Sequence, residues 1–210
     1  MNPRPNAPSV HTDATDEPET AAASDAAEAR LVDRAKAGER IAFEELVRRH
    51  ADRLYGVVLR FVASAEEAEE VTQEAFLRAW RGIGRFEGRS QFFTWLYRIG
   101  INEAKRRAER SPPSGLMVST EEQPVYDTTD PREVPAAQVE RVELRAVLEQ
   151  AVRALPIEYR GPIILRDIEG LSTTQAAAVL ELGDAALKSR LHRARMTVRK
   201  AIDSYLDVLE

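Results

Sequence analysis

The sequence predicts an all-α protein, built as two small helical domains joined by a flexible linker, the second domain containing a helix-turn-helix. Apolar residues recur at three- and four-residue steps through most of the chain, which is the period of amphipathic helices. A Pro-rich stretch interrupts this pattern and is too long for a loop inside a compact domain. Near the C-terminus, a short helix, a tight turn and a strongly basic helix follow one another.

These features divide the chain into four parts. Residues 1–27 are expected to be a disordered acidic tail, because they hold four prolines and almost no large apolar residue. Residues 28–110 and 138–210 are the two predicted domains, and residues 111–137, with five further prolines, are the flexible linker.

The net charge of -5 does not exclude a nucleic-acid partner, because the acid excess lies outside the predicted domains. Residues 1–30 hold two bases and six acids, and residues 111–137 hold one base and five acids. Residues 31–110 hold sixteen bases and thirteen acids, and residues 138–210 hold eleven of each. Local charge decides contact with nucleic acid, so both domains stay candidates for DNA binding.

The composition also narrows the compartment and the class of function. The chain has no cysteine, no long apolar run and no basic-then-apolar signal at its N-terminus. We therefore expect a cytoplasmic protein with no disulfide, no zinc–thiolate site and no membrane insertion. No pair of titratable residues, nucleotide loop or nucleophile motif stands at a usable spacing, so we expect no enzymatic activity and no cofactor.

The first domain begins with a short helix that ends near Gly38 and a longer one from about Ile41 to Phe61. His50 lies on the apolar stripe of the longer helix, with no second ligand at metal-binding spacing. We interpret it as a packed residue and expect no metal site.

A third helix, residues 65–81, is predicted after Ser64, which can cap it. The helix has an acidic side, formed by Glu67, Glu69, Glu70, Gln73 and Glu74. This side is either a solvated surface or a docking face for a basic partner, and the helix pattern alone favours the solvated surface.

A Gly-rich loop, residues 82–90, separates that helix from a fourth one, residues 91–110. The fourth helix opens with aromatic residues and ends with basic ones, a composition that grips single-stranded nucleic acid. The alternative is that Phe92, Trp95, Leu96 and Ile99 form the core of the domain. For most of them we prefer the core, which leaves base capture to the loop and the exposed side of the helix.

The second domain begins with an amphipathic helix stopped at Pro156. The next helix should run to Ile168, but Pro162 removes a backbone donor within it, so we expect a kink or a late start at Gly161.

The helix-turn-helix occupies residues 171–200. Ser172 can cap its first helix, and Gly183 with Asp184 supplies the break before the second. The second helix carries six bases and no acid from Ala185 to Lys200. Such a helix can enter the major groove of DNA; the alternatives are a solvated cationic face or a helix that docks on an acidic protein.

Three stretches of the sequence match a known pattern: EEAEEVTQEAFLRAW (residues 66–80), FEGRSQFFTWLYRIGINEAKRRAER (residues 86–110), and LRDIEGLS with KSRLHRAR (residues 165–172 and 188–195). With these motifs, residues 29–201 resemble an extracytoplasmic-function sigma factor. The resemblance implies a promoter-specificity subunit, without catalysis of its own, that binds bacterial core RNA polymerase and promoter DNA. An anti-sigma factor is a further partner that the resemblance implies.

The resemblance also implies a role for three sets of residues. The polymerase-docking set is Glu67, Glu69, Glu70, Gln73, Glu74 and Arg78. The minus-10 set, which would catch an unstacked base, is Arg85, Phe86, Glu87, Gly88, Arg89, Ser90, Arg98, Asn102, Lys105 and Arg106. The minus-35 set, which would read duplex DNA, is Asp184, Ala185, Ala186, Lys188, Ser189, Arg190, His192 and Arg193.

The turn of the helix-turn-helix departs from the family. Glu181 stands where the family usually has Gly, and Gly183 stands where it has Ser or Thr. Ala185 and Ala186 replace small polar residues at the end of the helix nearest the bases. Methyl groups in place of hydroxyls leave contacts with thymine methyls, or DNA shape, as sources of specificity.

Two other classes of function compete with this one. A dimeric helix-turn-helix regulator that acts without polymerase explains residues 138–210 but leaves the Gly-rich loop and the aromatic-basic helix unexplained. It would bind a palindromic site by itself, which a gel shift decides. A helical enzyme lacks any candidate site.

Overall fold

The computed structural model describes residues 17–110 and 136–209, and all the regular elements in these ranges are helical. The first domain consists of α1 (Glu17–Lys36), α2 (Arg40–Leu59), α3 (Ala65–Gly82), the 3₁₀ turn η1 (Ile83–Arg85) and α4 (Phe92–Arg110). The second consists of α5 (Ala136–Ala154), α6 (Ile157–Ile163), the π-helical turn η2 (Ile164–Ile168), α7 (Thr173–Leu180) and α8 (Asp184–Leu209). The predicted all-α fold with two helical domains is confirmed.

In the first domain, α2, α3 and α4 pack against one another around large apolar side chains. Leu54, Leu96 and Tyr97 are fully buried there. The predicted cap of α3 is present, since the hydroxyl of Ser64 accepts a hydrogen bond from the backbone N–H of Glu67 at 3.1 Å. Phe92 and Leu96 are buried, and Trp95 and Ile99 are partly buried against the core, so the interpretation of most of these four as core residues is confirmed.

The N-terminal helix starts earlier than the sequence suggested. Residues 17–27, predicted to belong to the disordered tail, are the first part of α1. An Ala-rich segment has high helix propensity, and α1 packs against α2, where Nε2 of His50 lies 2.9 Å from a carboxylate oxygen of Glu28. The rest of the predicted tail, residues 1–16, and residues 111–135 of the predicted linker lie outside the described residues.

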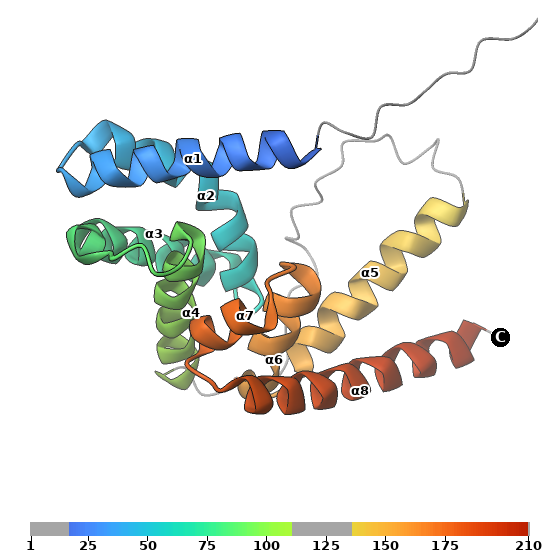
Figure 1. Cartoon of the computed structure of the whole chain (residues 1–210). Helices are drawn as coiled ribbons and strands as arrows, with labels where there is room; N and C mark the ends of the chain where they lie inside the picture. Colours follow the sequence, from blue (N-terminus) through green and yellow to red (C-terminus); the bar gives the residue numbers. More distant parts are fainter. Residues whose placement is uncertain (1–16, 111–135, 210) are drawn as a thin grey trace, which may run out of the picture.

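The second domain is built on α8, which α5, α6 and α7 contact along its length (Figure 1). The late start predicted at Gly161 was wrong, because α6 begins at Ile157 with Pro156 as its N-cap. Pro162 lies inside the helix, and the chain widens directly afterwards into the π-helical turn η2. The wider turn follows the position where proline removes a donor from the helical ladder.

The first helix of the helix-turn-helix is capped as predicted. The backbone N–H of Gln175 donates to the Ser172 hydroxyl at 3.1 Å, and the Ser172 N–H donates to the Gln175 side chain at 2.9 Å. This reciprocal pair is a capping box, which satisfies two donors at the start of α7.

The turn that follows is not formed as predicted. Glu181, rather than Gly183, takes the left-handed conformation, with φ 56° and ψ 41°. The N–H of Leu182 donates to the carbonyl of Ala177 at 2.9 Å, and the Leu182 side chain packs against the core. This is the Schellman ending of a helix, in which the apolar residue after the left-handed one fixes the register.

Replacing Glu181 with glycine should therefore stabilise the second domain by about 1 kcal/mol, because a residue with a Cβ is strained in the left-handed region and glycine is not. Urea unfolding followed by circular dichroism measures the change. Gly183→Ala is the matched control. Gly183 has no positive φ, and nothing lies within 4 Å of an added Cβ, so this change should be neutral or slightly stabilising. If Gly183→Ala destabilised the domain and Glu181→Gly had no effect, the left-handed residue of the turn would be Gly183, as the sequence predicted.

The two domains contact each other along α4 and α7, which lie side by side in Figure 1. Sequence patterns did not indicate this contact. It brings the first helix of the helix-turn-helix beside the aromatic-basic helix of the first domain.

Candidate nucleic-acid interface

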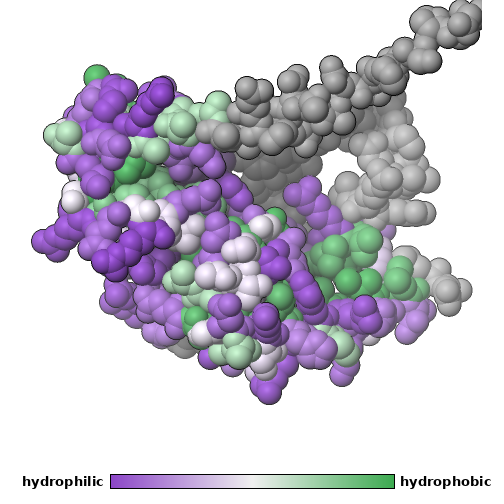
Figure 2. Space-filling model, in the orientation of Figure 1, coloured by the Kyte–Doolittle hydropathy of each residue, from purple (hydrophilic) through white to green (hydrophobic). Residues whose placement is uncertain are grey.

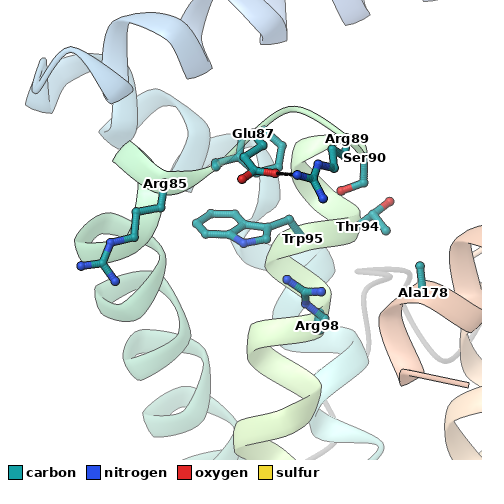
Figure 3. A pocket seen from close by; sticks show the side chains of 9 residues that line it. Arg85, Glu87, Arg89, Ser90, Thr94, Trp95, Arg98 and Ala178 are labelled. Carbon is teal, nitrogen blue, oxygen red and sulfur yellow. Dashed lines mark ion pairs between the residues drawn. The ribbon is translucent and has the colours of Figure 1, made fainter.

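A pocket of about 390 Å³ lies where the Gly-rich loop meets α4 (Figure 3). Gly88 turns the loop with φ +72°, a conformation that favours glycine. The pocket brings together most of the predicted loop residues with Arg98 and with three residues outside the predicted minus-10 set. The lining residues are Arg85, Phe86, Glu87, Arg89, Ser90, Thr94, Trp95, Arg98 and Ala178.

Trp95 supplies the aromatic surface of this pocket. Its ring lies 5.1 Å from that of Phe86 and 5.8 Å from that of Phe92, centroid to centroid. Phe86 is buried and Trp95 only partly so, which leaves Trp95 as the ring available for stacking. Its helical spacing favoured the core, with stacking on single-stranded nucleic acid as the alternative.

Thr94 adds a polar group that the sequence analysis missed. Its hydroxyl oxygen is buried and has no hydrogen-bond partner among the described residues. A buried hydroxyl without a partner is costly, and a ligand that donates or accepts a hydrogen bond there removes the cost. No sequence signal marks such a residue, since Thr94 sits on a helix face that reads as core.

The mouth of the pocket is cationic. Arg89 pairs with Glu87 at 2.5 Å, whereas Arg85 and Arg98 are exposed and form no ion pair with any described residue. Figure 3 shows the Arg98 guanidinium beneath the Trp95 ring. An aromatic face, an unpartnered hydroxyl and free guanidinium groups together suit an unstacked base with its phosphates.

Gly88, which turns the loop, does not line the pocket, and neither do the other remaining residues of the minus-10 set, Asn102, Lys105 and Arg106. The last three follow Arg98 along α4. Arg106 is exposed, whereas Asn102 and Lys105 are half-buried. Burial, followed by the positive charge of Arg190 from the second domain, lowers the pKa of Lys105.

The polymerase-docking set lies on α3, where part of its charge is already paired. Arg107 of α4 forms ion pairs with Glu70 and, at 3.8 Å, with Glu67. Arg78 bridges Glu74 at 2.7 Å and Glu103 of α4 at 3.0 Å. The pairing leaves a surface of mixed charge.

Leu77 gives this surface an apolar centre that the sequence analysis did not select. It follows Glu70 by seven residues and Gln73 by four, so all three share one helix face. Half of its surface is exposed. A single exposed leucine is common on protein surfaces, so Leu77 does not by itself mark an interface.

The minus-35 set lies on the first turns of α8. Leu187, Leu191 and Ala194 point inward and are buried. The predicted residues are exposed with one exception, Arg190, which is half-buried. The exposed ones are Asp184, Ala185, Ala186, Lys188, Ser189, His192 and Arg193.

The cations of this set are not neutralised by the part of the chain that the structure describes. No ion pair with any residue in the described ranges is formed by Lys188, Arg190 or Arg193. Arg193 donates one hydrogen bond, to the Tyr159 hydroxyl at 3.3 Å. By contrast, Arg195 is held by Asp167 through two hydrogen bonds of 2.8 and 2.6 Å. The start of α8 therefore presents free positive charge of the kind that meets phosphates.

A separate groove of about 650 Å³ lies between α5, η2 and α8. Figure 2 shows hydrophobic surface gathered at the end of the molecule formed by α5 and α8, on a face that is otherwise largely hydrophilic. Leu148, Val152 and Ile202 contribute to its apolar lining. Such a groove suits the apolar face of a helix from another protein rather than nucleic acid.

Within residues 17–110 and 136–209, no group of three or more His, Asp or Glu side chains is arranged to hold a metal ion. No helix in the same ranges is long and apolar enough to cross a membrane.

Each of the two domains matches a known protein family. The family model described as Sigma-70 region 2 matches residues 46–111, and that described as Sigma-70, region 4 matches residues 145–198. The RNA polymerase sigma-H factor of Pseudomonas aeruginosa is 37% identical over 182 residues, covering 84% of this chain and 94% of that protein. The ECF RNA polymerase sigma-E factor of Escherichia coli is 34% identical over 184 residues, covering 85% and 94%.

A solved structure gives the same result for the fold. The structure of CnrH in complex with the cytosolic domain of CnrY matches with a TM-score of 0.60 at 28% identity. The match covers 85% of this chain and 98% of that one.

Proposed function

The chain belongs to the extracytoplasmic-function sigma factors of the sigma-70 family, and we propose which of its surfaces performs each step of promoter recognition. As a sigma factor, it directs core RNA polymerase to specific promoters and assists their opening. It acts by binding, with polymerase supplying the catalysis.

The pocket beside the Gly-rich loop is the proposed site of the minus-10 element, and its geometry is the observation that carries the proposal. A base that has left the stack would lie on the partly exposed ring of Trp95, with the buried Thr94 hydroxyl as its hydrogen-bond partner. Arg85 and Arg98 would hold the adjoining phosphates. Capture of such a base offsets part of the free energy of strand separation.

The start of α8 is the proposed reader of the minus-35 element as duplex. Lys188 and Arg193 would contact phosphates, while Ser189, Arg190 and His192 are within the turns that reach base edges. Two weak sites on one chain raise the overall affinity when both are engaged, so promoter choice depends on both elements and their spacing.

The docking face of α3 is the proposed contact with core polymerase. Reversing one charge of this face, Glu70→Lys, should lower affinity for core polymerase about tenfold, or ~1.4 kcal/mol. Quantitative co-purification measures the change. Because Glu70 pairs with Arg107, the double variant Glu70→Lys with Arg107→Glu retains an ion pair within the chain and separates docking from folding.

Glu44→Lys on α2 is the matched control, since Glu44 is an exposed glutamate paired within its own helix. It should leave polymerase binding unchanged. Equal binding by wild type and Glu70→Lys would remove α3 from the interface.

Run-off transcription tests the proposed function directly. Purified core polymerase and the full chain are combined with a library of upstream regions from the source genome. We expect discrete transcripts only when the chain is present. A dimeric regulator would instead bind a palindromic site without polymerase and yield no such transcripts.

We also propose an anti-sigma protein as a regulatory partner. The support is the solved relative CnrH, whose structure is a complex with the cytosolic domain of CnrY. The groove between α5 and α8 is the surface we assign to a helix of that partner, since it is apolar and lies apart from both DNA-facing sets.

A further inference from the structure

The N-terminal helix α1 borders the Gly-rich loop. It packs against α2 and also contacts η1, where the loop begins. A pocket of about 220 Å³ lies between α1 and the loop, with Glu28 and Val32 of α1 on one wall and Phe86 of the loop on the other. Phe86 also lines the pocket that contains Trp95. The loop therefore lies between α1 and the proposed base site.

A histidine and a carboxylate, both largely buried, join α1 to α2. Nε2 of His50 lies 2.9 Å from a carboxylate oxygen of Glu28. An ionised carboxylate can only accept a hydrogen bond, so the ring N–H of His50 donates it. The two side chains are 9% and 22% exposed. Removing one partner would leave the other buried without a substitute, which makes this contact costly to break.

The His50 ring continues into a cluster of aromatic side chains. Its centroid lies 5.4 Å from that of Phe92, with the planes tilted by 49°. Phe92 meets Phe86 edge to face at 6.2 Å and lies 5.8 Å from Trp95. These separations are those of interacting aromatic pairs. An unbroken chain of ring contacts thus leads from the Glu28–His50 pair to the base pocket.

The position of the Trp95 ring depends on this cluster. Phe92 and Phe86 are 3% and 8% exposed, whereas Trp95 is only partly buried. A close-packed interior passes a displacement on to its neighbours, because it has few voids to absorb one. A shift of His50 would therefore move Phe92, and with it the ring that a base has to meet.

We propose that the Glu28–His50 pair is a positioning device for the minus-10 pocket. Through it, α1 fixes the His50 ring, His50 fixes Phe92, and Phe92 with Phe86 fixes Trp95 in the orientation that receives an unstacked base. The inference rests on the proposed function of this pocket. Neither Glu28 nor His50 lines the pocket, so both act through the aromatic cluster.

This inference gives α1 a function that its position in the chain does not suggest. The helix, Glu17–Lys36, lies outside residues 46–111, which match the Sigma-70 region 2 model. A merely structural α1 would contribute to the stability of the domain and leave Trp95 where it is. A positioning α1 changes the surroundings of Trp95 when the pair is broken, even in molecules that remain folded.

Quenching of Trp95 fluorescence in the free chain tests the proposal without DNA or polymerase. Trp80→Phe leaves Trp95 as the single tryptophan of the full chain. In this background, Glu28→Ala should raise the acrylamide quenching constant of Trp95 about twofold, because the ring loses its support. Glu28→Gln keeps an oxygen that can accept the His50 hydrogen bond, so it should stay close to the background value. If Glu28→Gln matched Glu28→Ala, the hydrogen bond would not be the link and the proposal would fail.

Binding of single-stranded DNA by the holoenzyme is the second arm. The probe is an oligonucleotide with the non-template minus-10 sequence of a promoter found by run-off transcription. Glu28→Ala and His50→Ala should each lower its affinity about tenfold, and the double variant should lose no more than either, because both changes break the same chain of contacts. A loss of about 100-fold in the double variant would show two independent effects and contradict the proposal.

Phe43→Leu is the matched control for a general loss of packing. Phe43 is a buried residue of α2 whose ring lies 5.1 Å from that of Trp80, and it lines neither pocket. It should change neither the quenching of Trp95 nor the binding of the oligonucleotide. Equal effects of Phe43→Leu and His50→Ala would reduce the pair to a structural role.

The two arms separate this inference from the proposed function. Unchanged quenching of Trp95 in both Glu28→Ala and His50→Ala overturns the positioning role. If quenching responds as expected but the wild-type holoenzyme does not bind the minus-10 strand, the proposed function of the pocket is wrong, while the coupling of α1 to Trp95 stands.

Discussion

Reversing the charge of Lys188 and Arg193 together should lower the affinity of the holoenzyme for its promoter about 100-fold. Both side chains are exposed on the first turns of α8 and are free of carboxylate partners among the described residues. Each charged contact with a phosphate contributes ~1.5–3 kcal/mol, and each adds about 0.9 to the salt dependence of binding. The slope of log affinity against log salt should therefore fall by about 2.

The matched control reverses two other exposed cations of the same helix, Arg199 and Lys200. That variant has the same net charge but leaves the start of α8 intact, so its promoter affinity should change far less. A filter-binding titration across a range of salt concentrations measures both. Equal losses in the two variants would show that α8 acts only through its total charge.

Leu187→Ala should lower the free energy of unfolding of the second domain by about 2–5 kcal/mol. Leu187 is fully buried on the inner face of α8, where the helix-turn-helix meets the rest of the domain. Removing its side chain loses hydrophobic burial and leaves a cavity. A loss of this size is comparable to the total stability of a small domain.

Two probes separate the domains in this experiment. Both tryptophans of the chain, Trp80 and Trp95, lie in the first domain, so their fluorescence reports that domain while circular dichroism reports both. In the variant, the second domain should unfold at a lower urea concentration than the first. The circular dichroism signal should therefore begin to fall at urea concentrations where the tryptophan fluorescence is still unchanged. Leu206→Ala, on the same helix at a position 49% exposed, should stay within about 0.5 kcal/mol of wild type. Similar losses in both variants would contradict the packing of α8.

Local features of the fold could be predicted from the sequence. The caps at Ser64 and Ser172 depend on residues three positions away, so the pattern contains everything needed. The inward face of α8 follows in the same way from apolar spacing. The roles of the three residue sets stay predictions from the resemblance, and the structure gathers most of the predicted loop residues with Arg98 into one pocket.

The left-handed turn could not be predicted, because two effects compete there. Gly183 is the residue that tolerates such a turn most easily. Burial of Leu182 nevertheless sets the register and places Glu181 in that conformation. Packing by a residue of the turn outweighs the local preference, and only the three-dimensional structure shows which residue packs.

The contact between the domains could not be predicted from the sequence either. Arg53 and Glu169, which are hydrogen-bonded across this contact at 2.8 Å, are 116 residues apart, and each reads as a solvated charge on its own helix. The sequence could not assign Thr94 and Trp95 to the pocket, because an apolar helical pattern cannot show which core residues also border a pocket.

Footprinting of the holoenzyme on one promoter tests most directly the claim that each domain reads its own element. Nuclease protection reports the minus-35 region, and permanganate oxidation of unpaired thymines reports opening at the minus-10 element. We expect Lys188→Glu with Arg193→Glu to abolish upstream protection, and Arg98→Glu to abolish thymine oxidation while upstream protection persists. If the two variants instead lost the same signal, or if Arg98→Glu left the thymines fully reactive, the division of labour between the domains would be wrong.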